Sequence, residues 1–467
     1  MKLSTRTLKV KKIIVRFLLF LLIAAIGVLI YYCSVSFPIM AAYGSKVMGS
    51  AVFVGGRNEH QVRDQDLSSY MMKLGDFTVN YADSSVTGSI FGFAKRKAIY
   101  RNGLGVTVVS ELDEQTIRSQ HMHLAPKSQS VTDTIPWPMG DQRIDTFPRV
   151  IDSAKLQSAI ENVFLEKDSI LPIRTRAVVV LYNGQLIAER YANGFNAHTK
   201  LAGWSMTKTV FGALTGILVK EGRLRIDEPA PVPEWRAVQD PRHAITLRDL
   251  LQQRSGLDFE EIYSKASDAT RMLYEKADMG GFTASHPLKN KPGAVFYYSS
   301  GNSNILSRII RQTLGDSLYY SFPYQQLFYK LGMYSAVIEP DASGTFVGSS
   351  YMYATARDWA RFGLLYQNDG VFNKERILPE GWIEQSTRPA PESLRGYGFQ
   401  IWLNTGSDTT IKHYPDAPGD MFYADGFESQ LIFIIPSKNL VVVRLGLTQH
   451  NNFDANAFLR DLLVAYK

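Results

Sequence analysis

The first pattern along the chain is a continuous apolar run. No charge interrupts residues 17–33, and residues 13–15 extend the run beyond Arg16. About 20 apolar residues cross the hydrocarbon core of a bilayer as a helix, and a flanking arginine can extend to the headgroups. The run therefore predicts one N-terminal transmembrane helix within residues 1–33.

Residues 34–148 carry weaker patterns. Residues 34–75 show little periodicity, whereas residues 77–109 are rich in β-branched residues with turn residues between them and predict a few strands. Residues 120–148 hold four prolines among polar residues, which is typical of a linker. We expect a small strand-containing region that ends in a linker.

Residues 149–467 begin with a mixed pattern. Apolar residues recur at helical spacing over residues 151–165 and predict a helix. Residues 176–191 form two apolar runs around Asn183-Gly184, the strongest short signal for a hairpin because both turn positions need a positive φ. This segment therefore predicts a helix followed by two antiparallel strands.

The C-terminal end of the chain mirrors that hairpin. Residues 430–435 and 439–447 are apolar strands around a short turn, and residues 452–466 are spaced as an amphipathic helix. Long helical patterns separate the two pairs of strands. We expect residues 149–467 to form one domain whose antiparallel sheet is completed by distant segments.

The charge distribution bears on location and partners. Of the net charge of +7, six positive charges lie in residues 1–16, and the remaining chain is close to neutral. We therefore expect no nucleic-acid partner, since such proteins carry their excess charge on the folded domain. The basic cluster precedes the apolar run, and the next basic residue is Lys46, so the positive-inside bias predicts a cytoplasmic N-terminus.

This topology predicts a single-pass protein of the inner (cytoplasmic) membrane whose remaining chain is extracytoplasmic, in the periplasm. A cleaved signal peptide is the alternative, but the run is long and no clear small-x-small cleavage site follows it. The single cysteine, Cys33, cannot form an internal disulfide.

The strongest candidate for chemistry is Ser205-Met206-Thr207-Lys208, the only Ser-x-x-Lys in the chain. The apolar residues that follow it are spaced as a helix, which places Ser205 near a helix N-terminus and Lys208 one turn along the same face. Free N–H groups there favour developing anionic oxygen. A desolvated lysine could accept the serine proton.

The alternative interpretation is structural: Ser205 caps the helix and Lys208 is solvated. The helix that follows is apolar, which favours a buried Lys208 instead.

Two further segments could complete a site. In Tyr298-Ser299-Ser300, the tyrosine could relay a proton and Ser300 could hydrogen-bond Lys208 or a substrate carbonyl. In Asp425-Gly426-Phe427, the glycine would let a substrate approach the backbone, and the N–H of Phe427 could form an oxyanion hole with that of Ser205. Each segment alone could equally be a turn.

Taken in order, the three segments resemble the active-site motifs of the penicillin-recognising serine hydrolases. These include class C β-lactamases, D,D-carboxypeptidases, related esterases and 6-aminohexanoate-dimer hydrolases. The Ser-x-x-Lys is complete, Tyr298-Ser299-Ser300 is similar to the family's Tyr-x-Asn, and Ala424-Asp425-Gly426 stands in the place of Lys-Thr-Gly. The resemblance implies an α/β fold: an antiparallel sheet flanked by helices, beside an all-helical subdomain, with the site in the cleft between them and no cofactor.

The candidate site residues follow from this resemblance and from the spacing. Ser205, Lys208 and Tyr298 are the candidate catalytic residues. The candidate oxyanion-hole and substrate-binding residues are Phe427, Gly426, Ser300, Asp425 and Trp204. Because the protonation states of Lys208 and Tyr298 are coupled, either could be the general base.

The departure at the third segment predicts the substrate class. Lactamases use the lysine of Lys-Thr-Gly to attract a carboxylate, but this chain has Ala424 there, followed by acidic Asp425. We therefore expect a membrane-anchored hydrolase of neutral amides or esters, or of substrates with an amine near the scissile bond, as in the 6-aminohexanoate-dimer hydrolases. A β-lactamase or D,D-carboxypeptidase acting on cell-wall peptides, and an inactive binding module, are the alternatives.

Other chemistries have weaker signals. The chain has no Gly-x-Ser-x-Gly, so the nucleophile elbow of α/β-hydrolases is absent. His121-Met122-His123 lacks a third ligand at a suitable spacing, and we expect no metal there.

Overall fold

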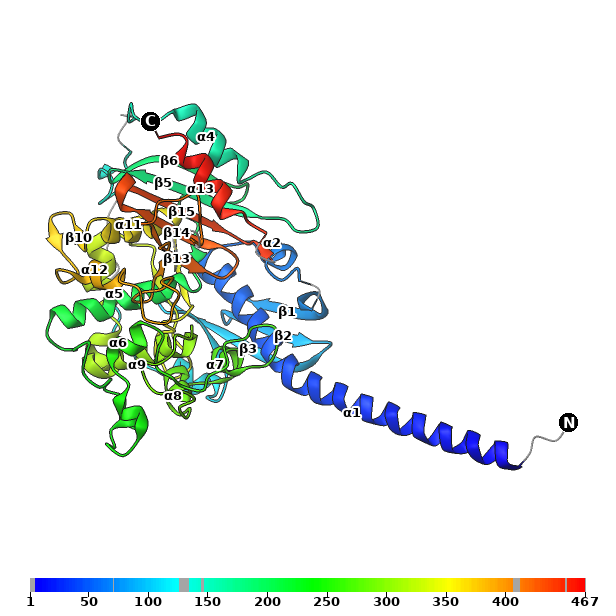
Figure 1. Ribbon diagram of the computed structural model, residues 1–467. Helices are drawn as coiled ribbons and strands as arrows, with labels where there is room; N and C mark the ends of the chain where they lie inside the picture. Colours follow the sequence, from blue (N-terminus) through cyan, green and yellow to red (C-terminus); the bar gives the residue numbers. More distant parts are fainter. Residues whose placement is uncertain are drawn as a thin grey trace.

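A six-stranded antiparallel sheet forms the centre of the body in the computed structural model (Figure 1). The structure describes residues 5–69, 71–125, 134–143, 147–405, 412–449 and 452–466. The sheet has the order β12-β13-β14-β15-β5-β6. Its strands are β5 (Thr175–Tyr182), β6 (Gln185–Tyr191), β12 (Trp402–Leu403), β13 (Phe422–Gly426), β14 (Gln430–Ile435) and β15 (Leu440–Gly446).

The two ends of residues 149–467 meet in this sheet. β15 pairs with β5, so that Val442 lies opposite Val180, while β5 and β6 form the hairpin predicted around Asn183-Gly184. Both turn residues have a positive φ, 48° and 75°. The prediction of one sheet completed by distant segments is therefore confirmed.

Helices cover both faces of the sheet. Val178 and Val180 pack with α4 (Ser153–Asn162) and α13 (Ala455–Leu463) on one face. Val179 and Leu181 belong to the core on the other face, which includes α5 (Met206–Lys220) and α11 (Ala356–Gln367). The alternation has a period of two, and two covered faces explain why residues 177–181 of β5 are apolar at every position.

A helical region lies beside the sheet (Figure 1). Its helices are α6 (Leu247–Leu251), α7 (Asp268–Glu275), α8 (Met279–Ala284), α9 (Ser300–Leu314) and α10 (Asp316–Tyr319). Smaller elements complete the body: α12 (Trp382–Ser386), β7 (Leu201–Ala202), β8 (Val337–Ile338), β9 (Met352–Ala354), β10 (Val371–Phe372) and β11 (Glu375–Arg376). The predicted α/β fold with a helical subdomain is confirmed.

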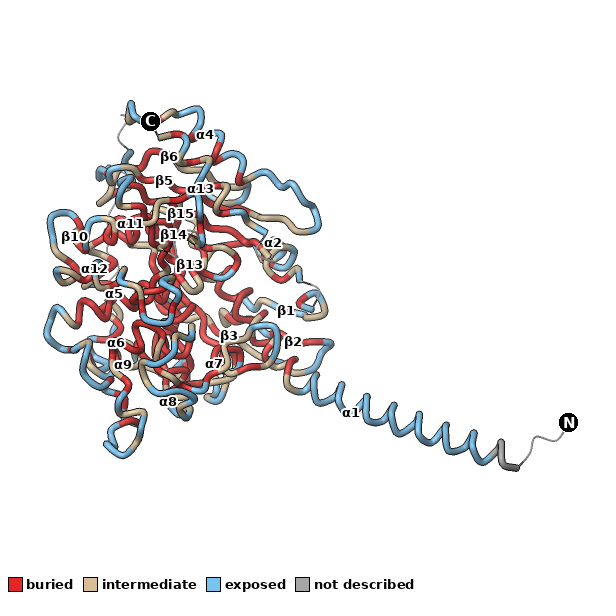
Figure 2. Tube along the Cα trace, in the orientation of Figure 1, coloured by how far each residue is buried: buried red, intermediate tan, exposed pale blue. Residues whose placement is uncertain are grey.

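The N-terminal helix α1 (Thr5–Gly49) does not end at residue 33 as predicted. It includes an 18-residue window long and apolar enough to cross a membrane, and no residue of that window is buried. From Ser36 onward α1 enters the body, and most of its residues there are buried or half-buried (Figure 2). A helix that is covered on all sides lacks a polar face, which explains why residues 34–49 carry no amphipathic pattern.

A four-stranded sheet wraps this buried part of α1. The strands predicted over residues 77–109 are present as β1 (Gly75–Asn80), β2 (Ser85–Ile90), β3 (Phe93–Arg101) and β4 (Gly105–Val109); two short helices, α2 (Glu59–Gln65) and α3 (Glu114–Arg118), flank them. Contact between β2 and α1 is close: a side chain at Gly88 would lie 2.4 Å from Ser45 Oγ. The predicted three-part division of the chain stays a prediction.

A buried ion pair fastens α1 to the rest of the body. Lys46 is 3% exposed and pairs with Glu339, which is fully buried. The Glu339 carboxylate also accepts hydrogen bonds from Ser50 Oγ at 2.8 Å and from the N–H of Val106 at 2.7 Å. α1 and β4 are thus tied to one acidic side chain from the segment before β9.

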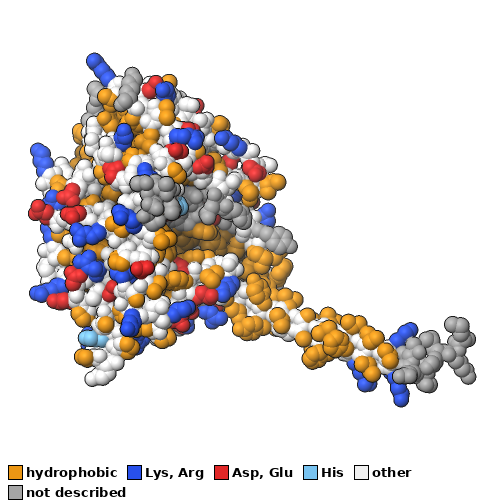
Figure 3. Space-filling view, viewed as in Figure 1, with side chains coloured by type: hydrophobic (Ala, Val, Ile, Leu, Met, Phe, Trp, Pro, Cys, Tyr) orange, Lys and Arg blue, Asp and Glu red, His pale blue; other side chains and the backbone are white. Residues whose placement is uncertain are grey.

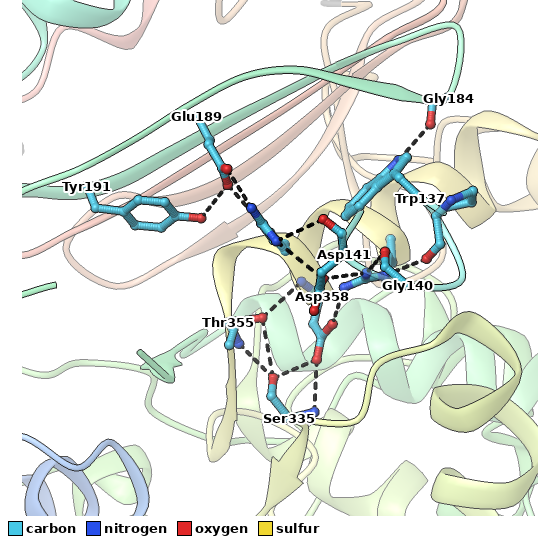
Figure 4. Close-up of polar contacts among 12 residues, drawn as sticks. Trp137, Gly140, Asp141, Gly184, Glu189, Tyr191, Ser335, Thr355 and Asp358 are labelled. Atoms are coloured by element: carbon cyan, nitrogen blue, oxygen red, sulfur yellow. Dashed lines mark hydrogen bonds and ion pairs between the residues drawn. The ribbon is translucent and has the colours of Figure 1, made fainter. Parts of the chain in front are cut away.

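The segment predicted as a linker is held to the body around Trp137 and Gly140, and parts of it lie outside the described residues. Trp137 is 3% exposed, and its Nε1 donates to the Gly184 carbonyl at 2.8 Å (Figure 4). Arg361 of α11 binds three groups of the segment: the carbonyls of Pro138 and Gly140 at 2.7 and 2.6 Å and the Asp141 carboxylate at 2.8 Å. Proline content alone therefore gave a wrong prediction for residues 134–143, which are held by specific contacts.

Candidate active site

Ser205 lies at the start of α5, directly after a tight turn. Trp204 has a φ of 47°, a conformation that non-glycine residues rarely adopt. A side chain at Gly203 would lie 2.2 Å from the Trp359 ring, so only glycine fits at the position before Trp204. The Ser205 side chain makes no capping hydrogen bond. The alternative interpretation, in which Ser205 caps the helix, is therefore wrong.

Lys208 is buried and hydrogen-bonded to neutral oxygens alone. Its side chain is 1% exposed, as the apolar character of α5 predicted. Nζ lies 2.9 Å from Ser205 Oγ, 3.1 Å from Ser300 Oγ and 3.0 Å from the Ser349 carbonyl oxygen. Burial lowers the pKa of Lys208 to about 8, and the negative charge of Glu261 opposes that shift. A lysine in this state can release its proton near neutral pH and then accept one from Ser205.

Tyr298 lies close to both Ser205 and Lys208. Nζ of Lys208 is 4.9 Å from the centroid of its ring, which stacks on Trp402 at 5.3 Å. Burial raises the pKa of Tyr298 well above its ordinary value and the neighbouring Tyr397 adds to this, whereas a hydrogen bond with Ser205 acts in the opposite direction. The phenol is therefore protonated at neutral pH and suited to donate a proton.

Glu261 is a polar partner of the site that the sequence did not indicate. Its carboxylate accepts from the N–H of Ser300 at 2.9 Å and from Ser300 Oγ at 2.6 Å. Tyr263 donates to the same carboxylate at 2.7 Å and lies 2.9 Å from Ser300 Oγ. Ser300 is thus held between Glu261 and Lys208, and it keeps the carboxylate one side chain away from the lysine.

The third predicted segment closes against the turn that precedes Ser205. A side chain at Gly426 would lie 2.1 Å from the carbonyl oxygen of Gly203, so glycine allows the end of β13 to meet this turn. The rings of Phe427 and Trp204 are 5.7 Å apart and perpendicular. Among the described residues, no hydrogen bond is found from the N–H of Ser205 or of Phe427. Both groups are available to bind a developing oxyanion, as an oxyanion hole requires.

Asp425 brings an acidic group into the same place. Burial raises the pKa of its carboxyl to about 7. No ion pair with Asp425 is present in the described part of the chain. The site therefore offers an acid that can be neutral or charged near neutral pH, one position after Ala424, which stands in the place of the lysine of Lys-Thr-Gly in the motif resemblance.

These residues meet at one cleft with a volume of about 830 Å³. Ser205, Tyr298, Asp425, Gly426, Phe427 and Trp204 line it, whereas Lys208 and Ser300 lie behind Ser205. α1 forms part of the wall through Ile39, Met40 and Tyr43, which the sequence did not indicate. Hydrophobic side chains continue from α1 onto the adjoining face of the body, where the surface is hollowed (Figure 3).

Metal ligands are not gathered in the parts of the chain that the structure describes. No group of three or more His, Cys, Asp or Glu side chains there could hold a metal ion, and His121-Met122-His123 lies in a segment without helix or strand.

Comparison with known proteins gives consistent matches. Residues 172–466 match the family model described as Beta-lactamase. The chain is 27% identical over 290 residues to the 6-aminohexanoate-dimer hydrolase of Paenarthrobacter ureafaciens, covering 58% of this chain and 72% of that protein.

Two solved structures have a similar fold. One is a penicillin-binding protein homolog from Caulobacter crescentus, with a TM-score of 0.54, 16% identity, and coverage of 69% of this chain and 99% of the other. The other is a family VIII carboxylesterase, with a TM-score of 0.53, 15% identity, and coverage of 67% and 96%.

Proposed function

Because the chain belongs to the Beta-lactamase family, we propose that it hydrolyses an amide or ester through an acyl-Ser205 intermediate. The observation that carries the proposal is the pair Ser205–Lys208: a buried Nζ lies 2.9 Å from the serine hydroxyl, with a lysine pKa of about 8. A solvated lysine would keep its proton and could not serve as a base.

The proposed reaction has two halves. Neutral Lys208 takes the Ser205 proton as Oγ attacks the carbonyl carbon, and the N–H groups of Ser205 and Phe427 bind the oxyanion. Tyr298 donates its proton to the leaving amine or alcohol and recovers one from Lys208, so the acyl-enzyme forms with no net change in protons. Water then attacks the acyl group, and its proton returns to Ser205 as the acid leaves.

The charge of the cleft supports the substrate class. Ala424 offers no cation for a substrate carboxylate, and Asp425 changes charge near pH 7. A neutral ester or amide fits this environment, and a substrate with an amine near the scissile bond gains attraction once Asp425 is ionised. The 6-aminohexanoate-dimer hydrolase of Paenarthrobacter ureafaciens is named for a substrate whose name contains an amino group.

The anchor completes the proposal. α1 crosses the inner membrane once, with the basic residues 1–16 in the cytoplasm and the hydrolase body in the periplasm. The long apolar helix and the basic cluster that precedes it support this topology.

Turnover of a simple ester tests the reaction. We expect the full chain in detergent to hydrolyse p-nitrophenyl acetate, and intact-mass measurement to find a transient acetyl group that maps to Ser205. Ser205→Ala should lose both signals and keep its thermal transition. Equal turnover in Ser205→Ala would overturn the proposal.

A further inference from the structure

We propose that the cleft takes its substrate from the bilayer: an amphiphilic ester or amide whose hydrocarbon chain lies along α1 and whose carbonyl lies at Ser205. This inference rests on the proposed function, because it names the substrate class of the same site. Its starting observation is that one continuous helix supplies both the apolar segment 17–33 and the cleft wall Ile39, Met40 and Tyr43.

The distance from the membrane follows from helix geometry. Tyr31 and Tyr32 are 69% and 50% exposed, and tyrosines at the end of a span mark the bilayer interface. At a rise of about 1.5 Å per residue, Ile39 lies about 10 Å beyond Tyr32 and Tyr43 about 17 Å. The headgroup layer is about 5–7 Å thick on each side, so the cleft wall begins just outside it.

A second element lies at the level of the headgroups. Phe91 lies in the turn between β2 and β3 and Phe93 is the first residue of β3; they are 61% and 70% exposed. The Phe91 ring lies 6.0 Å from that of Phe37, which is about 7.5 Å along α1 from Tyr32 and thus at the outer edge of the headgroup layer. Exposed phenylalanines at this depth are typical of side chains that enter the interface.

The charge distribution also supports an orientation of the sheet β1–β4 in which the β2–β3 turn faces the membrane. Lys95 and Arg96 follow the β2–β3 turn, where they can attract anionic headgroups. The turn between β1 and β2, at the opposite end of this sheet, carries Tyr81 and Asp83, and the cations near it are paired with acids: Lys97 with Asp83 and Glu114, and Arg118 with Glu114. The end beside α1 therefore combines exposed phenylalanines with an excess of basic residues, whereas the basic groups at the other end are neutralised by acids.

The lining of the cleft suits a hydrocarbon chain. Beside the α1 residues, the wall includes Met71, Met72 and Leu273, and Trp204 and Phe427 lie next to Ser205. An acyl chain along this wall would be removed from water over its length, which is the interaction that favours burial. A short polar substrate would leave the same wall exposed.

Two measurements on the full chain in vesicles of phosphatidylcholine and phosphatidylglycerol test the proposal. The first concerns orientation. In a Cys33→Ser background, a fluorophore at Phe93→Cys should be quenched by a nitroxide on the lipid headgroup. The same fluorophore at Tyr81→Cys, which is 62% exposed in the wild type at the opposite end of the sheet, should not. Equal quenching at the two positions would overturn the orientation.

The second measurement concerns the substrate class. Rate constants for labelling Ser205 are measured with a hexadecyl and an ethyl fluorophosphonate. The readout is the hexadecyl rate constant divided by the ethyl rate constant. We expect Met40→Gln and Phe93→Asp to lower this ratio by about tenfold, and Tyr81→Asp to leave it unchanged, since a few buried methylene groups account for such a factor. An unchanged ratio in Met40→Gln and Phe93→Asp would overturn the substrate class and leave the acyl-Ser205 chemistry standing. Failure of both probes to label a folded chain would overturn the proposed function itself.

Discussion

Lys46 and Lys208 are both buried on helices, but their partners differ in charge. Lys46 pairs directly with the buried Glu339, whereas the Lys208 ammonium contacts the hydroxyls of Ser205 and Ser300 and a backbone carbonyl. Burial lowers the pKa of both lysines, and for Lys46 the adjacent Glu339 carboxylate opposes that shift. A direct carboxylate partner thus gives a buried lysine a structural role, whereas neutral partners leave it able to exchange a proton.

The largest effect is expected at Lys208. Lys208→Met removes the proposed base and should lower kcat/KM for an ester by about 10²–10⁴-fold, the range for a positioned general base. Lys220→Met, at the exposed end of the same helix, is the matched control and should change neither the rate nor the stability by more than about 0.5 kcal/mol. Activity within threefold of wild type, or about 0.65 kcal/mol, in Lys208→Met would contradict the contrast between the two lysines.

Lys46→Met should act on stability instead. Removing the cation leaves Glu339 buried without its partner, which costs about 3–5 kcal/mol in the free energy of unfolding. Denaturant unfolding of the full chain in detergent measures this loss, and Lys46→Met/Glu339→Met should recover part of it. A loss below about 1 kcal/mol would show that the pair does not fasten α1 to the body.

The pH dependence of acylation should reveal the influence of Glu261, whose carboxylate is separated from Lys208 by Ser300. The neutral amine of Lys208 is the proposed base, so the rate should rise as pH increases through about 8. The Glu261 charge raises the pKa of Lys208. Glu261→Gln should therefore move the rising limb of the pH–rate profile to lower pH.

The neighbouring Glu260 provides the control, because it pairs with Lys265. Glu260→Gln should leave the limb in place. A limb that stays fixed or moves to higher pH in Glu261→Gln would contradict the assignment of Lys208 as the titrating group.

Asp66 and Asp425 show the same contrast between a buried group with a charged partner and one without. The effect expected on substrate preference is the smallest of those considered. Two arginines, Arg176 and Arg57, hold the pKa of Asp66 at about 2 against its burial, whereas burial without a cation raises that of Asp425 to about 7. The Asp425 carboxylate forms as pH rises through about 7, so a preference for amine-bearing over neutral esters should grow between pH 6 and 8.

Asp425→Asn should reduce this preference by about fivefold at pH 8, as for an ion pair of about 1 kcal/mol. The ratio of kcat/KM for matched esters with and without an amine measures it. A preference that is the same in Asp425→Asn and wild type at both pH values would exclude Asp425 from substrate selection.

The parts of the fold that were predicted correctly depend on local pattern. The strands β5, β14 and β15 are apolar at nearly every position because helices cover both faces of the sheet, and Asn183-Gly184 fixes the hairpin. Ser205 and Lys208 are brought together by helical spacing alone, so their contact could be predicted. Tyr298 and Gly426 required the motif resemblance, since their segments are distant in the chain.

The features that were missed depend on tertiary contacts. The continuation of α1 to Gly49 is enclosed by the sheet β1–β4 and has no polar face to mark it. Glu261 is 39 residues from Ser300 in the chain, and no spacing rule connects them. The packing of residues 134–143 depends on Arg361, far along the chain, which prolines in the segment could not indicate.

Covalent labelling tests whether Ser205 is a nucleophile that Lys208 activates. The full chain, Ser205→Ala, Lys208→Ala and Lys220→Ala are incubated with a short-chain fluorophosphonate, and the adduct is mapped by mass spectrometry. We expect one adduct on Ser205 that forms in wild type and Lys220→Ala, is absent in Ser205→Ala, and forms far more slowly in Lys208→Ala. Labelling that is equally fast in Lys208→Ala, or no labelling of Ser205 in a folded wild-type chain, would contradict it.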